Sequence, residues 1–239
     1  MNSNFLWHYF RLDDNLPHIL SQIKKDKVIE KAINLLHGLR LTRQEPWECL
    51  ISYICATYKN IPAIKKMIQN LSEKLGQKIN FENRCFYTFP KPNDLAKASL
   101  HELKNCGLGF RANYVLETAK LVENGDFDLE VLRKLDYNKA KSELLSLPGV
   151  GNKVADCVLL FSLDKLEAFP IDVWIKRILL EFYSSFFDPE FVEKVSTKTS
   201  LTPNEYLKIN NFARKYFGPY AGYAQEYLFH WKRLQSSQQ

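Results

Sequence analysis

The chain has 239 residues, of which 46% are apolar and 25% are charged, and these ordinary globular proportions exclude a disordered or fibrous chain. Thirty-three lysines and arginines against 27 aspartates and glutamates leave a net charge of +6, which permits a polyanionic partner without requiring one. We expect no membrane span, because every apolar run is too short, and no signal peptide, because the first residues lack a basic region followed by an apolar one.

Helical periodicity dominates the chain. Asp26 can cap a first helix that ends at Gly38, and Glu45-Pro46 begins a second that extends to Ile54. Residues 77–92 combine prolines with aromatic residues and predict a packed irregular connection. We predict an all-α fold, and periodicity alone does not distinguish one helical domain from two lobes. The remaining helices are predicted over residues 61–75, 93–98, 110–124, 128–134, 138–146, 152–162, 172–183, 203–216 and 219–233.

The cysteine pattern disfavours disulfides and cysteine-bound metals. The cysteines are odd in number and no two have C-x-x-C spacing, so neither a disulfide framework nor a zinc or iron–sulfur site is expected. Free thiols in a reducing cytoplasm are the simplest interpretation. The five residues are Cys49, Cys55, Cys85, Cys106 and Cys157.

The most informative segment is residues 147–157, with the sequence LPGVGNKVADC. Pro148 prevents the preceding helix from continuing, and Gly149 and Gly151 permit a tight turn before the next helix. The first N–H groups of that helix lie at the positive end of its dipole, which suits a DNA phosphate. A turn that merely needs glycine is the simpler alternative.

Two side chains near this turn add possible chemistry. Lys153 lies in the first helical turn, and its amine could act as a nucleophile on a sugar carbon beside a bound phosphate. Asp172 can cap the following helix as an ionised carboxylate, which suits stabilisation of positive charge on a sugar ring. Taken alone, Lys153 could be an ordinary surface lysine, and Asp172 could be a helix cap with no other role. The pair suggests cleavage of an N-glycosidic bond.

Residues 147–157 together with Asp172 resemble the helix-hairpin-helix, Gly/Pro-rich loop and aspartate signature of the DNA glycosylase superfamily, closest to its 8-oxoguanine branch. Residues 44–50, 107–114 and 218–225 support the resemblance in the family's order. The resemblance implies two helical lobes, residues 1–44 with 149–239 and residues 45–148, with a helix-hairpin-helix motif and a lesion-binding cleft between them. The implied partner is double-stranded DNA from which a damaged base is flipped.

The resemblance also implies a role for each matching residue. Lys153 would displace the base by attack at C1′, form a Schiff base and nick the strand by β-elimination, while Asp172 stabilises the developing charge. No metal or organic cofactor is required, although carbonyls near Leu145, Leu147 and Val150 could hold a structural monovalent cation. A monomer in a prokaryotic cytoplasm, near the nucleoid, is expected. The implied base pocket is Cys157, Gln225 and Phe229, and the implied DNA contacts are Gly149, Val150, Gly151, Asn60, the wedge Phe110 and its neighbour Arg111.

For three of these residues ordinary packing is the alternative to a role at the site. Cys157 could be a small core residue, Phe229 a core aromatic, and Phe110 could simply pack against Tyr114.

The chain departs from the family at several positions. Larger members begin with an antiparallel β domain, whereas this sequence starts at the helical part. Ala63 replaces an arginine that reads the opposite cytosine, so weak opposite-base selectivity is expected. Tyr58 replaces a gap-filling asparagine and Trp174 a phosphate-contacting histidine, and either aromatic could stack or pack.

Two other functions remain open at this point. The same fold could remove an alkylated purine instead of an oxidised one. A non-catalytic helix-hairpin-helix module could bind DNA through phosphates alone, but it would not need both Lys153 and Asp172.

Overall fold

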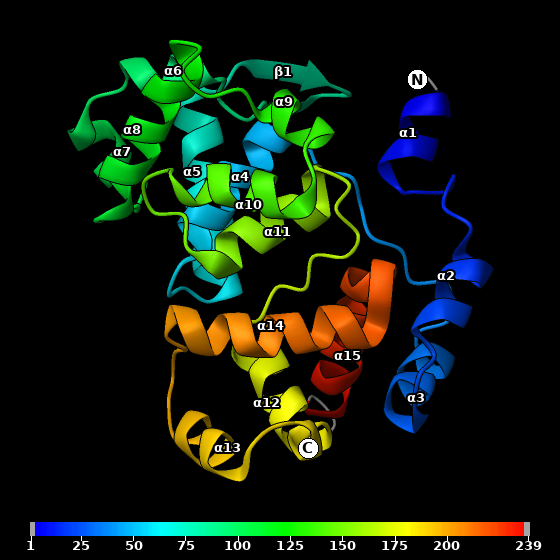
Figure 1. The fold of residues 1–239 in the computed structure, drawn as a ribbon. Coiled ribbons are helices and arrows are strands. Elements are labelled where there is room, and N and C mark those ends of the chain that lie inside the picture. The colour runs from blue at the N-terminus through cyan, green and yellow to red at the C-terminus, as the bar shows by residue number, and fades with distance from the viewer. Residues whose placement is uncertain (1–2, 237–239) are drawn as a thin grey trace. The chain divides into compact units, whose positions relative to one another are not determined.

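The computed structural model describes residues 3–236 and divides into two compact units. One unit consists of residues 1–43 with 159–239, and the other of residues 44–158. Nearly every element is a helix (Figure 1), which confirms the predicted all-α fold. Within the described range, no helix is both long and apolar enough to cross a membrane.

The unit of residues 44–158 is built around α4 (Pro46–Ala56). Glu45 caps this helix by accepting hydrogen bonds from the N–H groups of Trp47 (3.1 Å) and Glu48 (2.7 Å). Its apolar side chains are buried, and α5 and α8 pack against it. The elements of this unit are α4, α5 (Ile61–Leu75), β1 (Lys78–Phe81), β2 (Arg84–Tyr87), α6 (Pro92–Lys97), α7 (Leu100–Asn105), α8 (Arg111–Glu123), α9 (Leu129–Lys134), α10 (Tyr137–Leu145) and the first part of α11 (Asn152–Ser162).

The other unit is organised around α15 (Ala221–Ser236), which packs against α3 and α12. Aromatic rings fill much of its interior. Phe169 stacks on Phe217 at 6.0 Å between ring centroids, and Tyr183 makes an edge contact with Phe217. The other helices are α1 (Ser3–Tyr9), α2 (Leu16–Ile23), α3 (Lys27–Leu35), α12 (Val173–Phe182), α13 (Pro189–Ser196) and α14 (Pro203–Phe217), with short 3-10 turns at Ser184–Phe186 and Gly218–Tyr220.

Residues 77–92 differ from the prediction, because they include an exposed β-hairpin and not a packed irregular connection. β1 and β2 pair antiparallel, with Ile79 opposite Phe86. Glu82 and Asn83 both have positive φ, at 46° and 60°, as in the two-residue turns whose twist suits hairpins. The prolines that suggested irregular structure lie after the second strand, where they lead into α6.

Four short helices, α1, α2, α7 and α13, were absent from the sequence prediction. Each has six to eight residues, which is too short for a clear apolar period. Local capping explains why three of them form. Asn15, Ser99 and Asp188 accept hydrogen bonds from first-turn N–H groups of α2, α7 and α13 respectively.

Candidate active site

The turn between α10 and α11 requires glycine at one position and leaves open space at another. Gly149 has a φ of +77°, and a Cβ atom there would lie 2.5 Å from the ring of Tyr114. At Gly151, by contrast, nothing lies within 4 Å of the place that a Cβ atom would take. The Gly151 carbonyl accepts the first helical hydrogen bond, from the N–H of Ala155 at 2.9 Å. The backbone at Gly151 is therefore accessible to an approaching surface.

The start of α11 is suited to an anion. The N–H groups of Asn152, Lys153 and Val154 have no carbonyl one turn earlier within the helix, and they lie at the positive end of its dipole. The lysine side chain belongs to the same turn. A DNA phosphate held by these N–H groups would therefore bring the sugar–phosphate backbone close to the Lys153 amine.

Lys153 itself is half-buried against an aromatic ring of α4. Its ammonium nitrogen lies 4.9 Å from the centroid of the Tyr53 ring, within cation–π range. One turn later on α11, Cys157 is buried at 3% exposure. The contact with Tyr53 fixes where the amine lies, and the sequence alone did not indicate it, because the two residues are a hundred positions apart.

A buried ion pair joins the two helices of the hairpin. Lys141 on α10 donates to Asp156 on α11 at 2.9 Å, and the Tyr137 hydroxyl donates to the same carboxylate at 2.6 Å. Asp156 is fully buried. Because Asp156 lies one turn after Lys153, these contacts hold the part of α11 that carries the amine against α10, labelled beside it in Figure 1.

Asp172 is the N-cap of α12, as predicted. Its Oδ1 accepts a hydrogen bond from the N–H of Ile175 at 2.8 Å. Two hydrogen bonds from α14 hold the segment that precedes Asp172. The Asn210 amide donates to the Phe169 carbonyl at 2.9 Å, and the Tyr206 hydroxyl accepts from the Ile171 N–H at 3.2 Å. Tyr206 and Asn210 were not singled out from the sequence, although their spacing of four residues places both on one helical face.

Gln225 and Phe229 lie one turn apart on the same face of α15. Gln225 is only 4% exposed, and its Oε1 has no hydrogen-bond partner within the described part of the chain. Phe229 is half-buried, with the Arg233 guanidinium 5.3 Å from its ring centroid. A buried amide oxygen without a donor is costly, so this oxygen is suited to a ligand N–H.

The beginning of α15 is fixed by close packing. Gly222 lies against Leu160 and the Ala168 carbonyl, where a Cβ atom would come within 2.1 Å of the leucine. Its N–H donates to the Leu166 carbonyl at 2.8 Å. These contacts set the position of the helix that carries Gln225.

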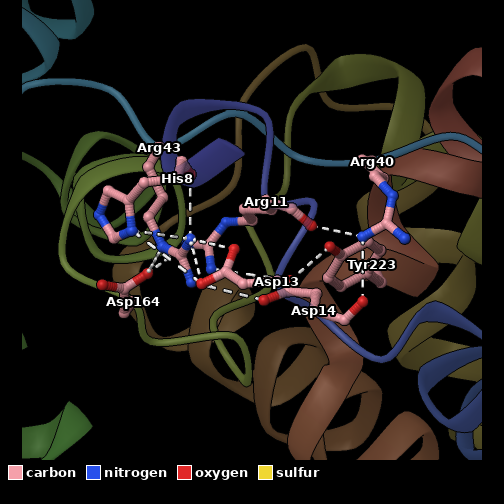
Figure 2. Close-up of polar contacts among 8 residues, drawn as sticks. All are labelled: His8, Arg11, Asp13, Asp14, Arg40, Arg43, Asp164 and Tyr223. Carbon is pink, nitrogen blue, oxygen red and sulfur yellow. Dashed lines mark hydrogen bonds and ion pairs between the residues drawn. The ribbon is translucent and has the colours of Figure 1, made fainter. Parts of the chain in front are cut away.

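A polar network ties the same helix to the N-terminal segment (Figure 2). The Tyr223 hydroxyl donates to Asp14 at 2.6 Å, and Arg11, which is 1% exposed, pairs with Asp164 at 2.6 Å. Arg43 pairs with the same Asp164 at 2.9 Å. Burial by itself would raise the pKa of Asp164, but the two arginines outweigh it and lower that pKa below its ordinary value.

The predicted DNA-contacting residues have different surroundings. Phe110, before α8, is 55% exposed, with the guanidinium of Arg111 4.3 Å from its ring centroid and Tyr114 in edge contact. Arg111 is 3% exposed and donates to backbone carbonyls. Asn60 caps α5 by accepting from the Ala63 N–H at 3.0 Å.

The candidate residues are divided between the two units. Lys153, Cys157, the hairpin glycines and Phe110 belong to residues 44–158, whereas Asp172, Gln225 and Phe229 belong to the other unit. Trp174, two residues after Asp172, is half-buried, and the guanidinium of the exposed Arg177 lies 5.7 Å from its ring centroid. The functional roles of all these residues stay predictions.

Comparison with known protein families matches residues 2–203 of the chain. Residues 2–50 match the N-terminal domain of 8-oxoguanine DNA glycosylase, and residues 51–203 match the HhH-GPD superfamily of base excision DNA repair proteins. The second match includes the hairpin, Lys153 and Asp172.

Individual relatives agree with the family match. A probable N-glycosylase/DNA lyase of Methanothermobacter thermautotrophicus is 33% identical, over 87% of this chain and 68% of its own length. The N-glycosylase/DNA lyase of Saccharomyces cerevisiae is also 33% identical, over 94% of this chain. The chain spans 65% of that yeast protein.

A solved structure agrees in fold as well as in sequence. The 8-oxoguanine glycosylase/lyase of Clostridium acetobutylicum, solved with double-stranded DNA containing cytosine opposite 8-oxoguanine, is 34% identical with a TM-score of 0.86. The match covers 98% of this chain and 75% of the clostridial one. In agreement with the motif at residues 147–157, the chain belongs to the HhH-GPD superfamily of base excision DNA repair proteins, in its 8-oxoguanine N-glycosylase/DNA lyase branch.

Proposed function

We propose that this protein removes 8-oxoguanine from duplex DNA and then nicks the strand, with Lys153 as the nucleophile. The observation that carries the proposal is the position of Lys153 in the first turn of α11, beside a turn suited to a phosphate and against the Tyr53 ring. The relatives named as N-glycosylase/DNA lyases support this reaction class.

The proposed chemistry needs only side chains and DNA. The neutral Lys153 amine attacks the sugar C1′, the bond from C1′ to the base breaks, and the base leaves with a proton. The C1′–O4′ bond of the sugar then breaks with protonation of O4′, which leaves an iminium ion between C1′ and the lysine nitrogen. This ion acidifies C2′, and loss of a C2′ proton expels the 3′ phosphate, which nicks the strand. Asp172 stays ionised as a helix cap and stabilises the positive charge that develops on the sugar.

Gln225, Phe229 and Cys157 are each proposed to contact the flipped base. The unpaired Gln225 oxygen is an acceptor for a purine N–H, and the half-buried Phe229 ring offers a stacking surface. Cys157, one turn from Lys153 and buried, is the third proposed contact. The solved complex of the clostridial relative with an 8-oxoguanine duplex supports duplex DNA as the partner.

Borohydride trapping tests the proposal. Incubation with a duplex containing one 8-oxoguanine, followed by borohydride, should give a covalent protein–DNA adduct that disappears in Lys153→Gln. A duplex with an alkylated purine in the same position tests the neighbouring activity. Binding of lesion DNA without an adduct or excision would instead indicate a non-catalytic module.

Asp172→Asn separates catalysis from capping. Asparagine caps helices about as well as aspartate, so the fold should remain while excision falls by at least about a hundredfold. Thermal unfolding measured alongside excision checks both parts. Near-normal excision would reduce Asp172 to a cap.

Three finer points belong to the same proposal. Ala63 cannot make a bidentate base contact, so excision rates opposite the four bases should be similar, and a strong preference for cytosine would contradict this. The Leu147 carbonyl, which accepts from the Val150 N–H at 3.2 Å, has a second lone pair for a monovalent cation. The protein is proposed to act as a monomer, which sedimentation with and without DNA would test.

A further inference from the structure

The chain after α4 makes a strained turn at Tyr58. Residues 56–59 form a β-turn closed by the Lys59 N–H and the Ala56 carbonyl at 3.2 Å. Thr57 has φ −58° and ψ 121°, and Tyr58 has φ +55°. These angles define a type II turn, in which the residue with positive φ is normally glycine. A tyrosine at this position is unfavourable and needs a compensating contact.

Arg111 supplies that contact. Its Nε donates to the Thr57 carbonyl at 3.0 Å and its Nη2 donates to the same oxygen, while Nη1 donates to the Leu108 carbonyl at 3.3 Å. Type I and type II turns differ by reversal of the central peptide, whose carbonyl here is that of Thr57. The buried guanidinium therefore favours the form in which Tyr58 has positive φ.

The strained turn presents an aromatic ring to solvent. Tyr58 is 83% exposed, although a ring of this size usually finds apolar contacts. Phe110, whose ring the same guanidinium covers, is 55% exposed. One buried arginine thus organises two outward-facing aromatic residues, and Phe110 contacts Tyr114, which in turn packs against Gly149 of the hairpin.

We propose that Tyr58 is a nucleobase-stacking residue and that Arg111 is the positioning residue that holds it outward. The proposal rests on the function proposed above, because a flipped base leaves unstacked bases in the duplex. Every base has a π-face, so stacking on tyrosine tolerates any opposite base. Stacking by Tyr58 would thereby replace the hydrogen-bond readout that Ala63 cannot provide. A surface ring with no ligand would not account for the strained backbone or for the arginine that maintains it.

The test measures binding to a duplex that carries a tetrahydrofuran abasic-site analogue, placed opposite each of the four bases. Tyr58→Ala should weaken binding about five- to a hundredfold, by a similar factor for all four, because one stacking contact is lost. Tyr58→Phe should bind like the unmodified protein. Phe81→Ala, which removes another exposed ring (61%) of the same unit, is the matched control and should bind normally.

Tyr58→Gly makes the test independent of stability. Glycine accepts positive φ without strain, so this variant should unfold at the same or a higher temperature and yet lose as much affinity as Tyr58→Ala. Binding within twofold of the unmodified protein for both variants would overturn the inference while leaving the glycosylase proposal intact. An unmodified protein that bound the analogue no better than undamaged duplex would overturn both.

A double-variant cycle tests the role of Arg111. Arg111→Met should weaken binding, and in the Tyr58→Gly background the same substitution should cause a smaller loss, because only the contact with Phe110 is then left to lose. Equal losses in both backgrounds would show that Arg111 does not act through Tyr58. Arg111→Lys, which can reach one carbonyl, should recover part of the affinity.

Discussion

At the scale of single residues, the two hairpin glycines are present for different reasons. Gly149 combines positive φ with a neighbour, Tyr114, that leaves no room for a Cβ atom. Gly151 has neither constraint, since open space surrounds it. A constraint inside the protein explains the first glycine, and the close approach of a bound partner is a reason for the second.

The two glycines should therefore respond differently to alanine. Gly149→Ala should lower the free energy of unfolding by about 2–4 kcal/mol, from backbone strain and from displacement of Tyr114. Gly151→Ala should change it by no more than about 0.5 kcal/mol, yet weaken binding of duplex DNA. Urea denaturation and DNA titration of both variants check this. Equal stability losses would mean that Gly151 also has an internal packing role.

At the scale of elements, the hairpin depends on buried polar contacts between α10 and α11. Lys141, Asp156 and Tyr137 all contact one another, because the lysine also donates to the tyrosine oxygen at 2.9 Å. Because the aspartate is fully buried, it depends on the lysine for its charge balance. The set holds both helices in one register, and the geometry of the turn between them follows from that register.

Removing one partner of the buried Lys141–Asp156 pair should destabilise the folded protein. Asp156→Ala leaves the Lys141 ammonium buried without its carboxylate and should lower the free energy of unfolding by about 3–5 kcal/mol. Glu130→Ala, which breaks the exposed pair of Glu130 with Arg133 at 3.1 Å, is the control, with an expected loss of at most about 1 kcal/mol. Chemical denaturation of both variants under the same conditions gives the comparison. Similar small losses would show that the buried pair is not essential.

At the scale of the whole molecule, the charge excess of +6 conceals a balanced network at the N-terminal segment. Arg11 and Arg43 pair there with the carboxylates of Asp13, Asp14 and Asp164, and Arg40 donates to the backbone carbonyl of Asp14 at 3.1 Å. A side-chain hydrogen bond from Arg43 is the main cause that lowers the pKa of Asp13. Asp164, with φ +56°, lies in the loop before α12, so the network connects distant parts of one unit.

These lowered carboxylate pKa values predict acid sensitivity. A carboxylate whose pKa is lower in the folded state stabilises the fold above its unfolded pKa, near 3.8, and this stabilisation is lost as pH falls through the folded value. The unfolding temperature should therefore fall as pH drops from about 5 to 2.5. Asp164→Asn, which tolerates positive φ, should be less stable at pH 7 but lose less on acidification. An unchanged slope in this variant would exclude Asp164 as a contributor.

The amino-acid sequence by itself determined the features that depend on neighbouring residues. Helix ends follow from caps such as Asp26 and Asp172, and the hairpin turn follows from Pro148 and Gly149, because capping and positive φ are local requirements. For that reason the all-α fold, the family and the candidate Lys153 and Asp172 could all be predicted.

Only the tertiary structure decided what depends on contacts between distant residues. From the sequence, Arg111 was expected to contact DNA beside the wedge Phe110. In the structure its side chain is buried and donates to the carbonyl of Thr57, 54 positions away. The contact of Lys153 with the Tyr53 ring could not be predicted from neighbouring residues either. The same is true of the Gln225 oxygen, which has no hydrogen-bond partner among the described residues. Burial and hydrogen-bond partners are set by packing between helices, and packing is a property of the folded chain that local spacing does not encode.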